Sequence, residues 1–136
     1  MGLQTTIGSA IYVKLITGPG TALCGSRAFD TQAPEGTVLP YYVFQQSAGG
    51  SDNLMPNPTA DFEYRIEVIG NTKAQARIGA GYIEDTFTLV GAIAVPGYTN
   101  YACQEGRYLD RVDNIGGTQY WRQGSFYRFR LTAGTI

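Results

Sequence analysis

Residues 61–70 read Asp61-Phe-Glu-Tyr-Arg-Ile-Glu-Val-Ile-Gly70, and they run directly into an Ala-rich segment that extends to Val90. Apolar and charged side chains alternate within 61–70, which is the pattern of a strand with one buried face. On the other face, Glu63 and Glu67 with Arg65 between them are expected to form a solvated ladder of opposite charges. The side chains predicted to face the core are Phe62, Tyr64, Ile66 and Val68.

A helix is predicted directly after this strand. Thr72-Lys-Ala-Gln75 has the sequence of a capping box, with Thr72 as the N-cap and Gln75 reaching back. The apolar residues that follow fall into two stripes at the helical period of 3.6 residues. The stripe expected to cover the sheet consists of Ala76, Ala80, Ile83, Phe87 and Val90. The stripe on roughly the opposite side consists of Ala74, Ile78, Tyr82 and Leu89. This second stripe needs its own cover, which is either another subunit or a loop of the same chain.

The flanking segments complete an α+β domain. Leu3–Ile16 predicts a first helix, which Gly18-Pro-Gly20 ends. A reversal is predicted at 114–117, and Gly124 has the character of a bulge within the closing strands. The other predicted strands are 27–31, 40–46, 101–105, 107–112, 118–122 and 125–132. This order predicts one domain over residues 1–136, with a mainly antiparallel sheet and with the N-terminal and central helices packed on one face.

Residues 47–60 form the longest segment without a periodic pattern. They join two predicted strands with many more residues than a hairpin requires, and long loops in compact domains are often functional or disordered. Leu54 and Met55 lie at the expected tip. We therefore expect either a contact made by these two residues or a plain hairpin tip.

The composition indicates a single domain with few charges. The chain has 136 residues, which is enough to bury a core, and 15% of them are charged against about 25% in an average soluble domain. Its 10 tyrosines and 18 glycines suit an assembly protein, and they also suit an ordinary β-rich domain. A formal net charge of −1 provides no basic field that would hold nucleic acid.

Signals for membranes and for disulfides are weak. The longest apolar run, Leu89–Val95, is too short to span a bilayer, and the N-terminal residues do not resemble a signal peptide, so we expect no membrane association. Cys24 and Cys103 are far apart in sequence. We expect reduced thiols in a cytoplasmic product, although one disulfide between them is also compatible with the sequence.

The sequence offers no recognisable catalytic constellation. It contains no histidine, which removes the most common general acid and base, the Ser-His and Cys-His nucleophile systems and most zinc sites. Gly20–Arg27 differs from a phosphate loop because it lacks the lysine and follows a helix instead of a strand. We therefore expect no catalytic residue, no metal site, no cofactor and no enzymatic activity.

Three parts of the chain resemble the tail-terminator (tail-completion, or tail-to-head joining) proteins of long-tailed bacteriophages. They are the helix Leu3–Ile16 with the later strand Pro40–Gln46, the strand Phe62–Ile69 with the helix Ala74–Leu89, and the closing strand Phe126–Leu131. Together they span nearly the whole chain. The resemblance consists of patterns of residue type, without a catalytic signature.

The resemblance implies a homo-oligomeric, typically hexameric, ring at the head-proximal end of the tail tube. Such a ring ends tail polymerisation and offers the surface that joins the head. Its partners would be further copies of the chain, the tail tube protein and the head–tail connector protein, and DNA would pass through its lumen without specific binding. The implied location is the virion, at the head–tail junction, after assembly in the host cytoplasm.

Ring closure needs a heterologous interface, in which one patch of each subunit meets a different patch of the next. The stripe of Ala74, Ile78, Tyr82 and Leu89 is the expected first patch. The loop that carries Leu54 and Met55 is the expected contact to a neighbour, the tube or the connector.

Three alternatives stay open at this stage. The chain could be a head-completion or connector ring protein at the same joint. It could be a monomeric module that binds a small apolar ligand between helix and sheet. It could also be an enzyme that uses Asp and Glu with a metal, or a reactive cysteine.

Overall fold

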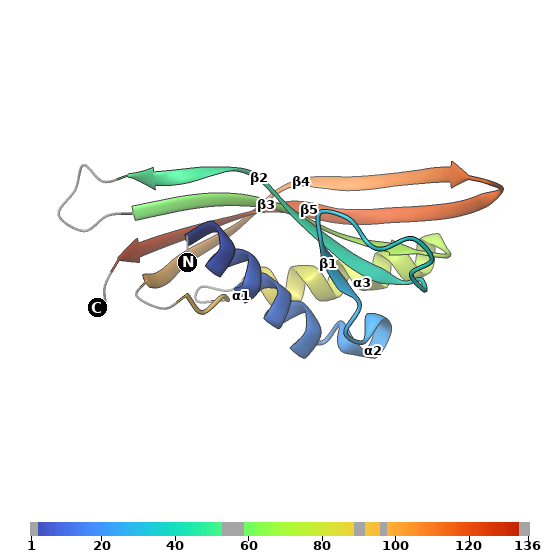
Figure 1. Cartoon of the computed structure of the whole chain (residues 1–136), viewed down its shortest axis with the longest axis horizontal. Helices are drawn as coiled ribbons and strands as arrows, with labels where there is room; N and C mark the ends of the chain where they lie inside the picture. The colour runs from blue at the N-terminus through green and yellow to red at the C-terminus, as the bar shows by residue number, and fades with distance from the viewer. Residues whose placement is uncertain (1–2, 53–58, 89–91, 96–97, 134–136) are drawn as a thin grey trace.

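The computed structural model describes residues 3–52, 59–88, 92–95 and 98–133, and it confirms the α+β class (Figure 1). Its elements are α1 (Leu3–Thr17), α2 (Thr21–Cys24), β1 (Ala28–Asp30), β2 (Tyr41–Asp52), β3 (Thr59–Gly70), α3 (Lys73–Phe87), β4 (Tyr98–Ile115) and β5 (Thr118–Ala133). The predicted first helix, central strand and central helix are all present. The short helix α2 is an addition that the sequence analysis does not predict.

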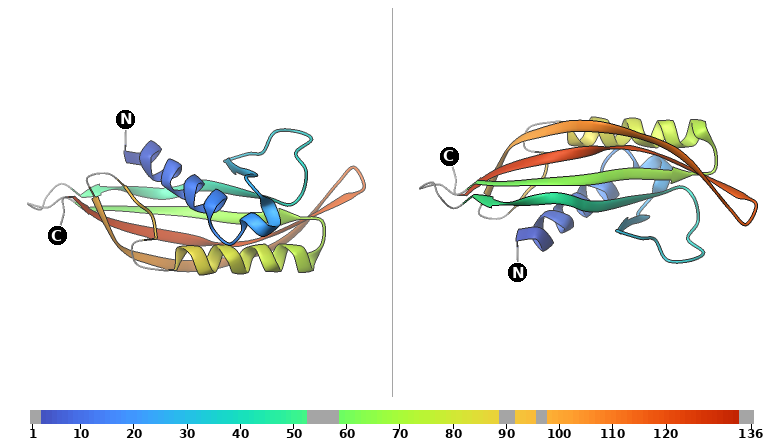
Figure 2. Two further views of the ribbon diagram at one scale, coloured as in Figure 1. Left: turned by 90° about the horizontal axis from the view of Figure 1, so that it is seen from below. Right: turned by 90° about the horizontal axis from the view of Figure 1, so that it is seen from above.

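Within the described residues, five strands form one sheet in the order β1-β2-β3-β5-β4. β1 pairs with β2 in parallel, and the other three pairs are antiparallel. α1 and α3 both lie on the same face of this sheet (Figure 2). The predicted arrangement, a mainly antiparallel sheet with the N-terminal and central helices on one face, is therefore confirmed.

α3 packs on the sheet through the predicted stripe. Its buried residues are Ala76, Gly79, Ile83 and Phe87. At position 79 a Cβ would lie 2.7 Å from a methyl group of Val68, so the glycine allows the helix to approach β3 closely. Val90 and Leu89, the last residues of the two predicted stripes, lie outside the described residues.

The N-terminus of α3 has the predicted cap. The Thr72 hydroxyl accepts a hydrogen bond from the Gln75 backbone N–H at 3.1 Å. The Gln75 side chain reaches back and accepts from the Asn71 backbone N–H at 2.7 Å. These two bonds satisfy N–H groups that have no partner within the helix, and they make the sharp turn from β3 into α3 favourable.

The prediction of an irregular segment over 47–60 is wrong at both ends. β2 continues to Asp52 and β3 begins at Thr59, with Asp52 paired to Thr59. A register shift between Gln46 and Ala48 lets β2 continue through small and polar residues that break the hydrophobic alternation. Leu54 and Met55 lie outside the described residues.

The predicted bulge at Gly124 is also wrong. Gly124 sits in regular pairing with Glu67 of β3 and Leu109 of β4. A Cβ at this position would overlap the Ile66 carbonyl oxygen and lie 2.6 Å from the Glu67 Cα. Glycine is required here because two backbones approach closely. A glycine within a strand commonly marks either a bulge or such a close approach.

β4 and β5 form a long hairpin whose turn was predicted correctly. Ile115 pairs with Thr118, and the two loop residues Gly116 and Gly117 have φ values of 59° and 84°. Two positive φ values in a two-residue loop are the geometry that matches the twist of the flanking strands. The end of this hairpin projects beyond the other strands (Figure 1).

Candidate assembly surfaces

The sheet face opposite the helices carries a charged network centred on Glu67. This side chain is buried, and its carboxylate lies 2.7 Å from the Arg122 Nη1 atom and 3.9 Å from the Arg65 Nε atom. Arg122 also lies 2.9 Å from Asp113 of β4. The predicted solvated ladder is therefore wrong for Glu67, because Arg122 of β5, which is far away in the sequence and close in the fold, covers it.

A second cluster lies on the same face. The Nε atoms of Arg128 and Arg130 lie 3.4 and 3.6 Å from the two carboxylate oxygens of Asp61. These three side chains are 39–46% exposed. Arginines on this face thus lie beside carboxylates, which leaves a mixed surface instead of a basic field.

The two thiols and the carboxylates of the described residues are the groups that thiolate chemistry and metal binding would use. Cys24 and Cys103 are free thiols, buried and half-buried respectively. Burial raises the pKa of the Cys24 thiol to about 11, and it also raises the pKa of Cys103, so both thiolates are disfavoured at neutral pH. Within the described ranges, no three His, Cys, Asp or Glu residues are grouped to hold a metal ion.

The part of the chain that the structure describes contains no helix long and apolar enough to cross a membrane.

The second stripe of α3, here called the outer stripe, is partly exposed. Ala74 is exposed, Ile78 is 52% exposed and Tyr82 is half-buried, whereas Leu89 is not among the described residues. Tyr82 lies one turn before Thr86, which faces the end of α1 at Gly18. The same chain therefore covers one side of the outer stripe, and Ile78 is left facing solvent.

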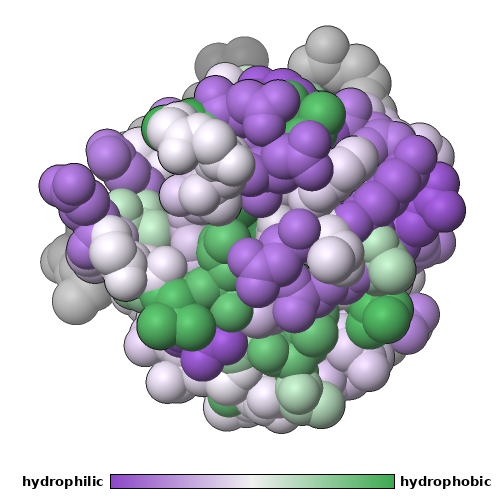
Figure 3. All heavy atoms as spheres, turned by 90° about the vertical axis from the view of Figure 1, so that its right-hand side faces the viewer, coloured by the Kyte–Doolittle hydropathy of each residue, from purple (hydrophilic) through white to green (hydrophobic). Residues whose placement is uncertain are grey.

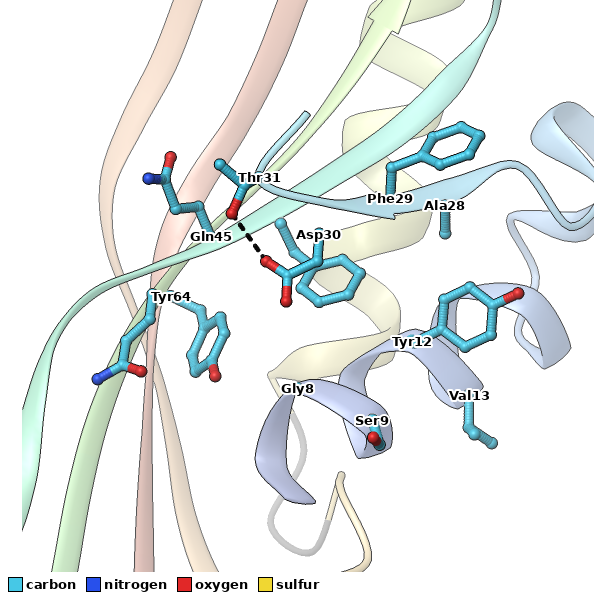
Figure 4. Close-up of a pocket in the computed structure, with 12 residues that line it drawn as sticks. Gly8, Ser9, Tyr12, Val13, Ala28, Phe29, Asp30, Thr31, Gln45 and Tyr64 are labelled. Atoms are coloured by element: carbon cyan, nitrogen blue, oxygen red, sulfur yellow. Dashed lines mark hydrogen bonds between the residues drawn. The ribbon is translucent and has the colours of Figure 1, made fainter. Parts of the chain in front are cut away.

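A groove of about 690 Å³ opens between α1 and the strands at the β2 edge of the sheet (Figure 4). Its wall includes Phe44, Gln46 and Tyr64, and α1 contributes Tyr12 and Val13. The α1 pair is 37% and 51% exposed, which is high for side chains of this size and apolarity.

One acidic side chain, Asp30 at the end of β1, points into this groove (Figure 4). Asp30 accepts a hydrogen bond from the Thr31 hydroxyl at 2.9 Å, and it is the one charged residue among those described as lining the groove. Burial, followed by the charge of Asp30, raises the pKa of the Tyr64 hydroxyl to about 12. The Asp30 carboxylate points into the groove between Tyr64 and Tyr12 (Figure 4), and a Cβ on Gly8 of α1 would lie 3.8 Å from its Oδ2 atom. The groove thus combines exposed apolar side chains of α1 with one carboxylate.

β4 carries the third set of exposed apolar side chains. Tyr108, Val112 and Ile115 are 73%, 42% and 62% exposed. Figure 3, which views the molecule from the end where the β4–β5 hairpin projects, shows hydrophobic atoms set among hydrophilic ones. Tyr108 and Val112 lie on one face of β4, level with Ile66 and Gly70 of β3, whereas Ile115 lies on the other face next to the turn. They are therefore separate exposed apolar side chains and not one continuous patch.

Comparison with solved structures shows where else this fold occurs. The chain matches a chain of the virion of a native gene transfer agent (GTA) particle with a TM-score of 0.77 and 18% identity, over 97% of this chain and 98% of the other. It also matches a solved chain whose name states no function, with a TM-score of 0.57 and 11% identity, over 99% of each. No protein-family model matches the sequence, and no curated protein matches it. At these identities the likeness establishes a shared fold over essentially the whole chain.

Sequence reasoning missed the groove and the exposed hairpin residues. The pattern of the first helix contained one relevant signal, because Tyr12 and Val13 are apolar on the side away from its main stripe. Only the fold shows that this side of α1 meets the edge of β2. The exposure of Tyr108 and Val112 depends on which strand ends the sheet, and the order of elements in the sequence does not determine that.

Proposed function

We propose that the chain is a structural protein of a phage or phage-like virion, where it forms a ring, taken as hexameric, at the head-proximal end of the tail tube. In this role it ends tail polymerisation and presents the surface that joins the head. Its partners are further copies of itself, the tail tube protein and the head–tail connector protein. It has no enzymatic role.

The observation that carries this proposal is the whole-chain likeness to a component of a GTA virion, with a TM-score of 0.77 and coverage of 97% and 98%. A likeness that covers nearly the whole of both chains favours a similar unit of assembly over a shared subdomain. The resemblance of the helix, strand–helix and closing-strand segments to tail terminators supports the proposed position at the end of the tail tube.

The exposed apolar features support assembly. Ile78 on α3, Val13 on α1 and Val112 on β4 lie on different elements around the molecule. Distinct patches are what a heterologous ring contact requires, because each subunit presents two different surfaces. The outer stripe with Ala74, Ile78, Tyr82 and Leu89 remains our proposal for one patch, and the loop with Leu54 and Met55 remains our proposal for a contact to a neighbour, the tube or the connector.

DNA would pass through the lumen of such a ring. The arginines on the sheet face opposite the helices support passage of DNA without tight binding, because Arg122 and Arg128 each lie within 3.4 Å of a carboxylate. Phosphate binding would have to compete with these carboxylates, and the chain as a whole has a net charge of −1.

A tube-growth assay tests the proposal. Purified tail tube protein would be polymerised with and without this chain, and tube lengths would be measured by negative-stain electron microscopy. We expect short tubes capped by rings at one end, whereas the variant Ile78→Asp, whose side chain faces solvent, should remain folded and fail to cap. Tubes of unchanged length with no bound ring would contradict tail termination. Binding to filled heads without any effect on tubes would favour a connector ring.

The groove beside α1 supports one further candidate, a monomeric module that binds a small apolar ligand. A volume of about 690 Å³ is within the range of ligand sites, and Phe44 and Tyr64 supply aromatic wall. This candidate predicts a strict monomer at every concentration, with ligand binding lost in Val13→Asp. Assembly into rings would count against it.

A further inference from the structure

We propose that the exposed face of α3 is a self-complementary contact surface, and that its occupant is α3 of a second copy of the chain in antiparallel orientation. This surface, here called the α3 face, consists of Ala74, Arg77, Ile78, Gly81, Glu84 and Asp85, all of which are exposed. In the left view of Figure 2, which looks at the helix side of the sheet, no other described helix or strand crosses in front of α3. The face is therefore open to a second helix.

A seam for that helix runs along the α3 face. Its residues are spaced by four, three and four positions, which is the spacing at which one helix meets another. They are Ala74, Ile78, Gly81 and Asp85. In an antiparallel pair centred between Ile78 and Gly81, Ile78 of one copy lies opposite Gly81 of the other, and Ala74 lies opposite Asp85. Because the pair is symmetric, each of these contacts occurs twice.

Gly81 has no explanation within its own chain. Glycine inside a helix is less favourable than alanine, and a Cβ at position 81 would meet no atom within 4 Å. In the proposed pair, Gly81 leaves room for the side chain of Ile78 of the second copy, which is 52% exposed in the single chain. The glycine also allows the two backbones to approach closely.

The charges of α3 are arranged against its own dipole. Lys73 and Arg77 lie towards the N-terminus, which carries a partial positive charge, whereas Glu84 and Asp85 lie in the last turn, where the partial charge is negative. Not one of these four side chains forms an ion pair with another described side chain. Their placement is thus unfavourable for the helix of a single chain, and a partner would account for it.

An antiparallel second copy makes the same charges favourable. It brings the basic end of one α3 beside the acidic end of the other, so Arg77 faces Glu84 across the seam and Lys73 faces Asp85. Arg77 and Glu84 are seven residues apart and therefore lie on the same flank of the seam, and an antiparallel pair places equivalent flanks side by side. A parallel pair would place like charges together. Charge complementarity therefore selects a second copy in the antiparallel orientation.

The proposed contact is small and joins only two copies. α3 has 15 residues, and one pair of such helices buries less than the roughly 1,600 Å² of a standard interface, so we expect a weak dimer. Ile78 also belongs to the outer stripe that we propose as a ring patch, so one copy cannot use it in both contacts. The dimer is therefore a form of the free chain that opens when a ring forms through the outer stripe. The dimer itself does not depend on the tail role.

An exchange of charges between two copies tests the pair. Native mass and sedimentation velocity would be recorded for the unmodified chain, Arg77→Glu, Glu84→Arg and an equimolar mixture of the two variants. The concentration series would extend to about 1 mM, at about 50 and 500 mM NaCl. The matched control is Glu35→Arg, which makes the same change of charge as Glu84→Arg at an exposed position between β1 and β2. Circular dichroism would verify that each variant is folded.

We expect a dimer whose dissociation constant rises about tenfold or more in each single variant, because each reversal places like charges together at two symmetric contacts. High salt should weaken the unmodified dimer as well. The mixture should form a dimer with one copy of each variant at about the unmodified affinity, and Glu35→Arg should leave the affinity unchanged.

Three results would overturn the α3 pair: a monomer up to about 1 mM, a ring that forms with no dimer at lower concentration, or a dimer that the charge reversals do not weaken and the mixture does not restore. The tail role is measured separately by tube capping, so it would stand or fall independently of these results.

Discussion

Two glycines of α3 allow a matched test of how the helix packs on the sheet. Gly79 faces the sheet, where a Cβ would lie 2.7, 2.8 and 3.0 Å from three side-chain carbons of Val68. Gly81 lies two residues further on, and a Cβ there would meet no atom within 4 Å. The same change, glycine to alanine, therefore probes intrinsic helix propensity at both positions and close packing at one of them.

The expected magnitudes follow from these distances. Gly81→Ala should stabilise the chain by about 0.8–1 kcal/mol, since only the helix propensity changes. Gly79→Ala gains the same term, but overpacking a buried site costs about 1–3 kcal/mol. Val68 is completely buried and β-branched, so it cannot rotate away easily, and the upper half of that range applies. The two variants should thus differ by about 2–3 kcal/mol, with Gly79→Ala less stable than the unmodified chain by about 1–2 kcal/mol.

Urea unfolding, followed by far-ultraviolet circular dichroism, measures both effects. The protein concentration should be the same in all samples and below that at which assembly is detected, because association shifts apparent stability. The expected order of midpoints is Gly81→Ala, unmodified chain, then Gly79→Ala. If Gly79→Ala were stabilised as much as Gly81→Ala, the close approach of α3 to β3 would be wrong.

Three further perturbations follow from local contacts. Glu67→Gln should destabilise the fold by about 2–3 kcal/mol in the same urea titration. This is less than the ~3–5 kcal/mol that is usual for a broken buried ion pair, because Arg122 keeps its second partner, Asp113, at 2.9 Å. Asp61→Asn, in the more exposed cluster on the same face, should cost less than about 1 kcal/mol. Thr72→Ala removes the cap on the Gln75 N–H and should lower the free energy of unfolding by about 1 kcal/mol, with Thr88→Ala at the other end of α3 as a comparison. Raising the pH should also destabilise the chain, because burial raises the pKa of the Cys24 thiol from 9.0 to about 11 in the folded state. The contribution of the protonated thiol to the free energy of unfolding is fully present below pH 9, and it declines by about 2–3 kcal/mol as the pH approaches 11. Thermal unfolding between pH 8 and 11 should show this slope and a shallower one in Cys24→Ala; equal slopes would contradict the assignment.

The sequence predicted best where local and global signals agree. The strand 61–70, the capping box at Thr72 and the apolar stripe of α3 are all readable from spacing alone, because one face of each element is buried in the same core. The two-glycine turn at Gly116 and Gly117 was similarly local, since positive φ at both positions favours glycine.

The parts that the sequence could not predict depend on long-range pairing. The sequence alone suggests a bulge at Gly124, whereas the structure shows that the backbone of Ile66 and Glu67 in β3 lies too close for a side chain at this position. The burial of Glu67 depends on Arg122, which is 55 residues away. β2 extends through Ser47–Asp52, where hydrophobic alternation is lost, because β3 supplies a partner strand. Which strands lie at the edges of the sheet follows from the order of the strands in space, β1-β2-β3-β5-β4, which differs from their order in the sequence.

Native mass across a concentration series, with negative-stain images of the same samples, tests the central claim most directly. The ring proposal predicts a discrete closed oligomer, with a central opening visible in the images and a mass equal to a small whole number of 14.7 kDa chains. If the chain is a template-dependent ring former, the same species should appear once tail tubes are added. A strict monomer at every concentration, both alone and with tail tubes, would contradict the proposal.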